Sequence, residues 1–484
     1  MSDASLVKLL LTQIKSGDRE AAAASINELT SSSFDIGDLW ITAARAAVTI
    51  GELTLAEICA DKFLQIDTLD TQRALHTAGL LADAGRFDMA LELIEPRLQQ
   101  RPDDPSLNHL CGTVYQQLGQ RQRAEQHLLC TLKTAALAGM TWLTLAAQHK
   151  FDDGDPLLRR LMSLKSAFSD TDPTNRMHYQ YAVGKALLDR RDYEEAFDAF
   201  ALGASLAPGA THYDPAKERR AIEAIIATND KRTLAATARI NSVGDRNVFV
   251  IGPPRSGTTL LQRILTAHRD VAGGGEFSGI GVATMNLRRE GLCSAAALSQ
   301  LDDAGAGKLE DVGRSYTHLA TERFGVPHNI VDKSINNARF VGMIAKVFPE
   351  APIIVLERDI NDVAWSCFRT CFSQGQHWSW SLENIASHLK AELRLIDHWR
   401  DVLPGRLIDV RYENLVNNPE QELPALLRAC GLPADDQVIN FHRQEGAVTT
   451  ASVAQVDQPL NTRSVGAAVH VAHRMQPFVD AFKD

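Results

Sequence analysis

The amino-acid sequence predicts an all-α array of helical repeats followed by an α/β domain with a three-layer, parallel-sheet fold. Three observations lead to this prediction. The first half repeats with a fixed period, the second half alternates short apolar strands with helical segments, and a glycine-rich turn joins the first of those strands to a helix. Buried apolar strands that alternate with helices are typical of a parallel sheet covered on both faces.

The repeat is visible in four glycines that are spaced 34 residues apart, each followed five residues later by an alanine. These pairs are Gly17 and Ala22, Gly51 and Ala56, Gly85 and Ala90, and Gly119 and Ala124. A period of about 34 residues is the signature of helix-turn-helix tetratricopeptide repeats. The register slips after residue 135 and returns with Gly184, Ala196 and Phe200. We therefore expect one irregular repeat between them.

The composition divides the chain into three parts: an array over 1–212, a connecting helix and linker over 213–246, and an α/β domain over 247–484. Within the last part, apolar runs predict strands at 248–251, 329–332, 351–357 and 405–412. In such folds ligands bind at the carboxyl ends of the strands. Residues that follow the predicted strands are therefore the candidates for function.

Bulk properties exclude several classes of protein. A formal net charge of −10 over 484 residues disfavours a general binder of nucleic acid or anionic membranes. The seven cysteines include no C-x-x-C pair and no metal-like cluster, which indicates a cytoplasmic protein with reduced thiols and no metal site. Cys367 and Cys371 are interpreted as small core residues. Neither a leader peptide nor a membrane span is predicted.

The stretch VFVIGPPRSGTTLLQRILTAH, residues 248–268, predicts a buried strand, a tight turn and a helix that begins at Gly257 or Thr258. This arrangement directs backbone N–H groups and the positive end of the helix dipole at one point, which suits a phosphate or sulfate. The turn fits G-x-x-x-x-G-K-[ST] except that Thr258 replaces the lysine that reaches the β- and γ-phosphates. This replacement argues against a nucleoside triphosphate, while Arg255 still offers a fork of donors to an oxyanion. The alternative is an ordinary strand-turn-helix corner.

Other strand ends carry further candidates, each with a plainer alternative. Arg358 and Ser366 follow the 351–357 strand and offer a charge and a hydroxyl to a second phosphate, although Arg358 could instead form a surface ion pair. Lys333 follows the 329–332 strand, where a solvated lysine is also common. Glu276 follows three glycines and is either a general base or points away from the anion site.

Two segments together resemble one enzyme family. The run FVIGPPRSGTTLL resembles the 5′-phosphosulfate loop of the sulfotransferases that use 3′-phosphoadenosine 5′-phosphosulfate (PAPS), and LERDINDVAWS resembles their 3′-phosphate motif. More narrowly, the chain is similar to bacterial sulfotransferases with an N-terminal tetratricopeptide array, and its second half is similar to the tyrosylprotein sulfotransferases. The resemblance implies a P-loop-type α/β sulfotransferase domain that needs no metal.

The resemblance also implies roles for particular residues. Those implied to bind PAPS are Arg255, Ser256, Gly257, Thr258, Thr259, Arg358, Ser366, Arg463, Ser464 and Gly466. Glu276 matches the general base, and Arg255 and Lys333 match residues that stabilise charge during transfer. Two departures from the family pattern are Ala467-Ala468, where the family usually has Arg-Trp, and Phe277, where it has a second glutamate.

The predicted function is transfer of a sulfuryl group from PAPS to an acceptor hydroxyl, with a protein or peptide tyrosine as a candidate acceptor. His377 is a second candidate base, although a packed or surface histidine is the simpler interpretation. Two other functions stay open: a P-loop nucleotide kinase, and a tetratricopeptide adaptor with a non-catalytic nucleotide-binding domain. The array itself is expected either to bind a protein partner or to support the second domain or a dimer interface.

Overall fold

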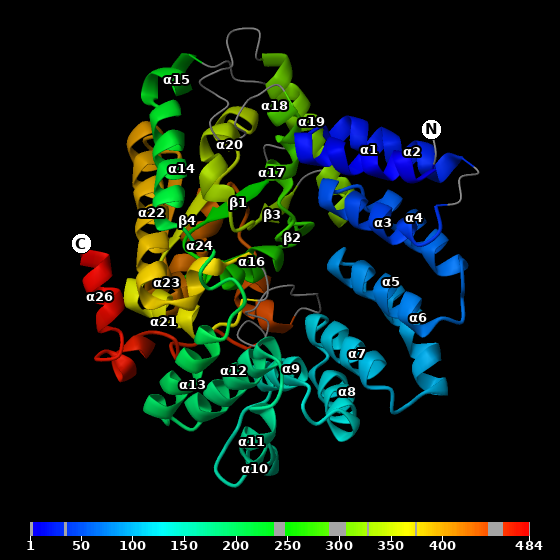
Figure 1. Ribbon diagram of the computed structural model, residues 1–484. Helices are drawn as coiled ribbons and strands as arrows, with labels where there is room; N and C mark the ends of the chain where they lie inside the picture. The colour runs from blue at the N-terminus through cyan, green and yellow to red at the C-terminus, as the bar shows by residue number, and fades with distance from the viewer. Residues whose placement is uncertain are drawn as a thin grey trace.

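The computed structural model of the chain describes residues 3–32, 36–236, 247–289, 306–326, 329–372, 375–443 and 458–483. Figure 1 shows the N-terminal helices as an arch that curves along one side of an α/β domain and returns to it. The arch contacts the domain at both of its ends. Among the described residues, no helix is long and apolar enough to cross a membrane.

The first part of the arch consists of four antiparallel helix pairs. They are α1 (Asp3–Ser16) with α2 (Arg19–Ser31), α3 (Leu39–Ile50) with α4 (Leu53–Gln65), α5 (Thr71–Asp83) with α6 (Phe87–Gln100), and α7 (Pro105–Gln117) with α8 (Arg121–Thr134). The four glycines of the 34-residue period lie in the turns within these pairs, with φ angles of 82°, 78°, 77° and 75°. Glycine adopts this left-handed conformation without the steric cost of a Cβ atom.

The second part of the arch covers the segment in which the register of the sequence repeat slips and returns. It is built from α9 (Gly139–Gln148), α10 (Pro156–Ser163), α11 (Lys165–Phe168), α12 (Pro173–Asp189) and α13 (Tyr193–Ser205). Helix α9 packs against α12, and the two short helices α10 and α11 lie between them in the sequence. At Gly184 in α12, a Cβ atom would lie 2.6 Å from the ring of Phe200 in α13, so the close packing of this pair depends on glycine.

The α/β domain contains a five-stranded sheet. Its strands are β1 (Val248–Ile251), β2 (Gly273–Gly275), β3 (Ile330–Asp332), β4 (Ile353–Glu357) and β5 (Leu407–Arg411), all paired in parallel in the order β2-β3-β1-β4-β5. Four of the strands coincide with predicted apolar runs. The sequence analysis missed β2 because its three residues are glycines, which lack the β-branched side chains that indicate a strand.

Alternate residues of the central strands enter different hydrophobic cores. Phe249, Ile251, Ile353 and Val355 join one core, and Val248, Val250, Ile354 and Leu356 join the other. The first core is covered by helices α14 (Pro215–Thr228), α19 (Ala306–Phe324), α20 (Val341–Val347) and α22 (Leu382–Val402), and the second by α16 (Thr258–Thr266), α23 (Tyr412–Asn417) and α24 (Pro419–Ala429). The predicted parallel sheet with helices on both faces is therefore confirmed.

The remaining elements complete the domain around these layers. They are α15 (Lys231–Ala236), α17 (Gly279–Ala283), α18 (Met285–Arg289), η3 (Asn337–Phe340), α21 (Ile360–Phe368), η4 (His377–Trp380), η5 (Asp436–Arg443), η6 (Ala467–Val471) and α26 (Gln476–Lys483). Helix α14, in the segment expected to connect the two parts, packs along α22 and buries Ile222 and Ile225 in the first core.

The N-terminal end of the arch contacts the domain through polar side chains. The amide of Arg19 donates a hydrogen bond to Asn286 Oδ1 at 3.0 Å, and the amide of Thr54 donates one to Glu322 Oε2 at 2.7 Å. The turn at Gly51 rests on α19, where a Cβ atom would lie 2.1 Å from the side chain of Leu319. This end of the arch therefore docks on α18 and α19.

The C-terminal end of the arch shares a hydrophobic core with the domain. Phe197 of α13 stacks on Trp365 of α21, with ring centroids 5.7 Å apart and planes 7° from parallel. The hydroxyl of Tyr181 in α12 donates a hydrogen bond to the carbonyl oxygen of Phe368 at 3.3 Å. Helices α9, α12 and α13 are thereby fixed beside the carboxyl end of β4 (Figure 1).

Candidate functional site

The turn between β1 and α16 is held close to its neighbours by glycines. A Cβ atom on Gly252 would lie 2.6 Å from the carbonyl oxygen of Leu356 at the end of β4, and one on Gly257 would lie 2.6 Å from the ring of Tyr412. Both residues have positive φ angles, 148° and 109°. Because the turn fits against β4 and the end of β5, the N-terminus of α16 faces the carboxyl edge of the sheet.

Arg255 has an unusual backbone and a buried guanidinium group. Its φ of 68° places it in the left-handed region, which arginine rarely adopts and which neighbouring structure must enforce. Its Nε donates a hydrogen bond to Ser366 Oγ at 3.2 Å. Burial lowers the pKa of Arg255 from its ordinary value, and the positive charge of Arg358 also lowers it. The predicted residues Arg255 and Ser366 are thus in contact.

The next residue, Ser256, carries an unpaired polar atom. Its side chain is fully buried, and its Oγ has no hydrogen-bond partner among the described residues. Buried hydroxyl groups are normally paired, so an isolated one indicates a partner that is not part of the chain. Ser256 directly precedes Gly257, the N-cap of α16, where backbone N–H groups favour an anion.

Arg358, directly after β4, joins four segments of the domain. Its Nη1 donates to the carbonyl oxygen of Arg255 at 3.2 Å, and its Nη2 donates to that of Ser464 at 2.5 Å. The guanidinium group lies over the ring of Tyr412 at 4.6 Å and its Nη2 is 3.9 Å from Asp362 Oδ2. Its Nε is buried without a hydrogen-bond partner among the described residues. Arg358 is therefore part of the predicted cluster rather than a surface ion pair.

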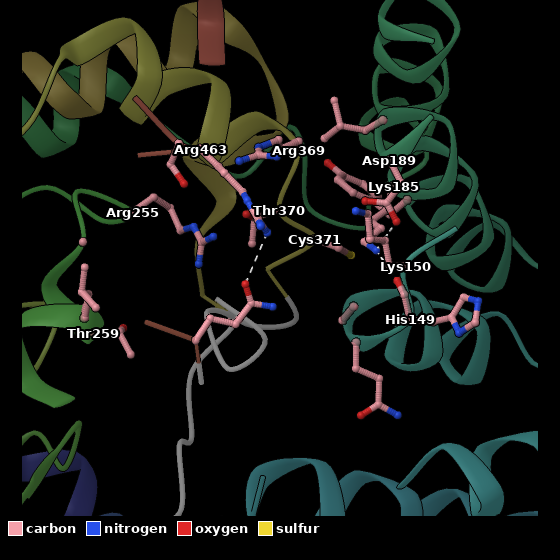
Figure 2. A pocket seen from close by; sticks show the side chains of 18 of the residues that line it. His149, Lys150, Lys185, Asp189, Arg255, Thr259, Arg369, Thr370, Cys371 and Arg463 are labelled. Atoms are coloured by element: carbon pink, nitrogen blue, oxygen red, sulfur yellow. Dashed lines mark hydrogen bonds and ion pairs between the residues drawn. The ribbon is translucent and has the colours of Figure 1, made fainter. Parts of the chain in front are cut away.

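The C-terminal segment is anchored to α21 by Asp362. The two carboxylate oxygens of Asp362 accept hydrogen bonds from the amides of Gly466 at 2.7 Å and Ala468 at 2.9 Å. The preceding Ser464 contacts Arg358 through its carbonyl oxygen. Arg463 points its side chain toward Gln458, to which Nη1 donates at 3.4 Å (Figure 2). The three predicted residues of this segment therefore lie beside Arg358.

Glu276 and Lys333 meet at the ends of neighbouring strands. Glu276 follows β2, Lys333 follows β3, and the amide of Lys333 donates to the carbonyl oxygen of Gly275 at 3.1 Å. Lys333 Nζ forms a hydrogen-bonded ion pair with Glu276 Oε1. The lysine side chain is 5% exposed and the glutamate 31%. Burial lowers the pKa of Lys333 from its ordinary value, while Glu276 raises it and Arg255 lowers it further.

A buried network around Asp332 fixes the position of this pair. Asp332 Oδ1 accepts hydrogen bonds from Ser334 Oγ at 2.7 Å and Asn337 Nδ2 at 2.9 Å, and Oδ2 accepts one from the hydroxyl of Tyr316 at 3.1 Å. Burial raises the pKa of Asp332. Ser334 Oγ in turn accepts a hydrogen bond from the amide of Ser278 at 2.9 Å. The loops that carry Lys333 and Glu276 are therefore tied to each other.

A pocket of about 660 Å³ lies between the domain and the arch. The domain lines it with the start of α16, Tyr412 and the segment 458–464, and the arch lines it from α9 and α12 (Figure 2). Among the described residues that line it, one side chain is acidic, Asp189, and seven are basic: Arg121, Lys150, Lys185, Arg255, Arg358, Arg369 and Arg463. In a chain of net charge −10, this excess of positive charge indicates a ligand with several negative charges.

Arg369 is a site residue that the sequence analysis missed. It is the residue directly after α21 and follows Ser366 by three positions, a spacing that places two side chains on the same face of a helix. Burial, together with the charges of Arg255 and Arg358, lowers the pKa of Arg369 to about 10. Its Nε is buried with no hydrogen-bond partner among the described residues. In the sequence, its spacing of three residues from Ser366 was the pattern that could have identified Arg369 as a site residue.

Two further residues considered in the sequence have plainer roles. His377 packs beside His212 at the junction with the arch, with ring centroids 5.5 Å apart, and it does not line the pocket among the described residues. Cys367 is buried with its Sγ 3.5 Å from the carbonyl oxygen of Pro254, and burial raises the pKa of its thiol to about 12. This agrees with a packed, inert cysteine.

Comparison with known proteins points to one family. Residues 247–436 match the model of the sulfotransferase family. An uncharacterized protein of Aquifex aeolicus (strain VF5) is 28% identical over 296 residues, which is 59% of this chain and 38% of that protein. Protein-tyrosine sulfotransferase 1 of Danio rerio is 26% identical over 228 residues, which is 44% of this chain and 60% of that enzyme.

Among solved structures, the sulfotransferase domain from the curacin biosynthetic pathway covers 49% of this chain and 99% of its own length, at 18% identity and a TM-score of 0.31. The matched region 247–436 contains the turn before α16, the Lys333–Glu276 pair, Arg358 and Ser366. Residues 247–436 are thus similar to the sulfotransferase family.

Proposed function

We propose that this chain transfers a sulfuryl group from PAPS to an acceptor hydroxyl. The observation that supports this most directly is the arrangement at the carboxyl edge of the sheet. There, the turn before α16 lies between the Lys333–Glu276 ion pair on one side and Arg358 with Ser366 on the other. This arrangement offers separate positions for the 5′-phosphosulfate, the 3′-phosphate and the acceptor.

The donor would be held at its two anionic ends. The backbone N–H groups of 256–259 and the hydroxyls of Thr258 and Thr259 would bind the 5′-phosphosulfate at the N-terminus of α16, where the unpaired Ser256 Oγ also lies. The 3′-phosphate would lie by Ser366, with Arg358 and Arg369. The unpaired Nε atoms of the two arginines are donors that a phosphate oxygen can satisfy.

The proposed reaction is an in-line substitution at sulfur. The acceptor oxygen bonds to sulfur as the bond from sulfur to the 5′-phosphate oxygen breaks, and 3′-phosphoadenosine 5′-phosphate leaves. Glu276 takes the proton of the acceptor hydroxyl. Lys333 and Arg255 stabilise the negative charge that grows on the departing phosphate oxygen, which is catalysis by positioning and electrostatics.

The acceptor that we propose is a tyrosine hydroxyl of a protein or peptide. The support for it is the likeness of the second half of the chain to the protein-tyrosine sulfotransferase of Danio rerio. A phenol of pKa about 10 needs only a modest base, and a carboxylate can serve.

Binding of 3′-phosphoadenosine 5′-phosphate tests the donor assignment. We expect this nucleotide to raise the melting temperature of the chain in a thermal-shift assay, because a ligand that binds only the folded state stabilises it. ATP with magnesium is the matched comparison. Stabilisation by ATP alone would favour the nucleotide kinase, because that enzyme holds a β,γ-phosphate pair.

The Glu276→Gln variant tests whether the site is catalytic. Loss of the general base should lower kcat by roughly 10²- to 10⁴-fold, while the affinity for 3′-phosphoadenosine 5′-phosphate changes little. Sulfate transfer to a tyrosine peptide and a direct nucleotide titration measure the two effects. Full activity in the variant would assign the base elsewhere. A wild-type chain that binds the nucleotide without any transfer would favour the non-catalytic adaptor.

A further inference from the structure

We propose that the helical arch supplies part of the donor site, with Lys185 and Lys150 binding the 3′-phosphate from the side opposite Arg369. This inference rests on the proposed function and extends it to a part of the chain outside the family match, which begins at residue 247. Lys185 belongs to α12, and Lys150 lies two residues beyond the end of α9. Both residues line the same pocket as Arg369 (Figure 2).

Lys185 is held in a fixed position by two hydrogen bonds that use two of its three N–H donors. Its Nζ donates hydrogen bonds to the carbonyl oxygen of His149 and to Asp189 Oδ2, the latter at 2.6 Å. Asp189 Oδ2 is itself fixed by the amide of Phe151 at 3.0 Å. An ammonium group has three protons, so one N–H donor remains beside these two hydrogen bonds, and the ring of Phe151 also lies near Nζ, with its centroid 5.5 Å away.

The lysines and Arg369 face the same part of the pocket. Burial lowers the pKa of Lys185, Asp189 opposes this, and the positive charges of Arg369 and Lys150 lower it further. The negative charge of Asp189 also raises the pKa of Arg369, against the effect of burial. Lys185 is repelled by Arg369 and by Lys150, and an anion between these cations would relieve that repulsion.

The charge of the 3′-phosphate gives the arch lysines a role. A phosphate monoester carries about 1.5 to 2 negative charges at neutral pH. On the domain side, Arg358 already donates to two carbonyl oxygens and stacks on Tyr412, and Arg255 belongs to the turn that holds the 5′ end. Arg358 and Arg369 supply positive charge from the domain side, and Lys185 and Lys150 are placed to add positive charge from the side of the arch.

The order of the strands separates this site from the acceptor. Glu276 and Lys333 follow β2 and β3, whereas Arg369 ends the helix after β4, and β1 lies between β3 and β4. Lys185 and Lys150 face Arg369, which lies on the side of the sheet that β4 forms. Their position favours the donor nucleotide over an acidic acceptor, which would approach Glu276.

The test compares two nucleotides that differ only in the 3′-phosphate. We would titrate 3′-phosphoadenosine 5′-phosphate and adenosine 5′-phosphate into the full chain and its Lys185→Gln, Lys150→Gln and Lys133→Gln variants by calorimetry. Lys133 is an exposed lysine of α8 outside the pocket, so its variant is the matched control. Thermal unfolding of each variant reports whether the fold is intact.

We expect Lys185→Gln to weaken binding of 3′-phosphoadenosine 5′-phosphate by about 10-fold or more, as loss of a charge-assisted hydrogen bond does. Binding of adenosine 5′-phosphate should stay within about twofold. Lys150→Gln should show a smaller and salt-dependent loss of a few-fold, because its side chain is exposed. The control should bind both nucleotides like the wild type.

Several results would overturn the proposal. An equal loss for both nucleotides would show that Lys185 has only a structural role. If the lysine variants bind 3′-phosphoadenosine 5′-phosphate with unchanged affinity but have a raised KM for the acceptor, the lysines bind the acceptor instead. Should Lys185→Gln fail to fold, an unchanged bisphosphate affinity in Lys150→Gln decides against the proposal. A wild-type chain that binds neither nucleotide would overturn the proposed function itself.

Discussion

Single residues set the shape of the turn before α16. Arg255 has a left-handed backbone, and Gly252 and Gly257 have φ angles that only glycine adopts easily. The strain at Arg255 is maintained because the turn is wedged between the end of β4 and the ring of Tyr412. Backbone strain of this kind is concentrated at functional sites, and here it aims the arginine at Ser366.

Replacement of Gly257 by alanine should therefore damage the site. The new Cβ would lie 2.6 Å from the Tyr412 ring at a φ of 109°, so the turn or the ring must move. We expect a loss of stability of about 1 to 3 kcal/mol and a loss of nucleotide binding.

Gly281→Ala is the matched control for this prediction. Gly281 lies inside α17, and an added Cβ would meet Phe340 no closer than 3.8 Å. Alanine favours a helix over glycine, so this variant should be neutral or slightly stabilising. Chemical denaturation measures both effects, and equal stability of the two variants would contradict the prediction.

The helices and strands were largely predictable from local patterns, whereas the walls of the site were not. The strand at 248–251 and the helix beginning at Thr258 coincide with β1 and α16, because burial and turn chemistry are both visible within a few residues. The repeat period indicates that one face of each helix in the arch is buried. It does not indicate which part of the chain covers that face. The contribution of Lys150 and Lys185 to the pocket depends on packing between α13 and α21, and so it carried no sequence signal.

Between elements, the contact of the arch with α19 contains a titratable group. Glu52 accepts hydrogen bonds from Arg19 Nη2 at 2.6 Å and from His318 Nε2 at 3.1 Å. The hydrogen bond to Glu52 raises the pKa of His318, against the effect of burial, and Glu322 also raises it. Burial alone would raise the pKa of Glu52, but the contacts with His318 and Arg19 lower it overall.

This contact should weaken as the pH rises. Because the pKa of His318 is raised in the folded state, its stabilising effect is complete below its unfolded pKa of about 6.5 and is lost as the pH rises through the folded value. His318 is nearly half exposed, so after solvent screening we expect an effect under about 1 kcal/mol.

Hydrogen exchange of α4 and α19, followed over a range of about pH 6 to 8, measures this effect after correction for the intrinsic exchange rate. His318→Gln is the comparison, and its protection should not vary with pH in this way. The ion pair between Arg19 and Glu52 is present in both the wild type and the His318→Gln variant. The contact between the arch and α19 should therefore weaken at high pH but not be lost. A wild-type contact that is insensitive to pH would show that His318 adds nothing.

At the scale of the whole molecule, the arch and the domain share a core and should unfold together. The aromatic rings of Tyr181, Phe197 and Phe200 from the arch pack with Trp365 and Phe368 from α21. We expect a single cooperative transition in which helix content and tryptophan fluorescence change at the same temperature.

Phe197→Ala provides the test of this coupling. Removing a buried phenylalanine costs about 3 to 5 kcal/mol, so the melting temperature should fall for both signals together. Phe63→Ala, which alters a separate core at the N-terminal end of the arch, is the comparison. Two resolved transitions in the wild-type chain would contradict the shared core.

The shared core also limits how the chain can be divided by protein engineering. A recombinant fragment that starts at β1 would uncover Trp365, Phe368 and the aromatic residues of η4, which are buried against α12 and α13. Contiguous apolar patches of this kind promote aggregation. Efforts to transplant the α/β domain, or to graft a different arch onto it, should therefore keep helices α9 to α13 with the domain as one unit.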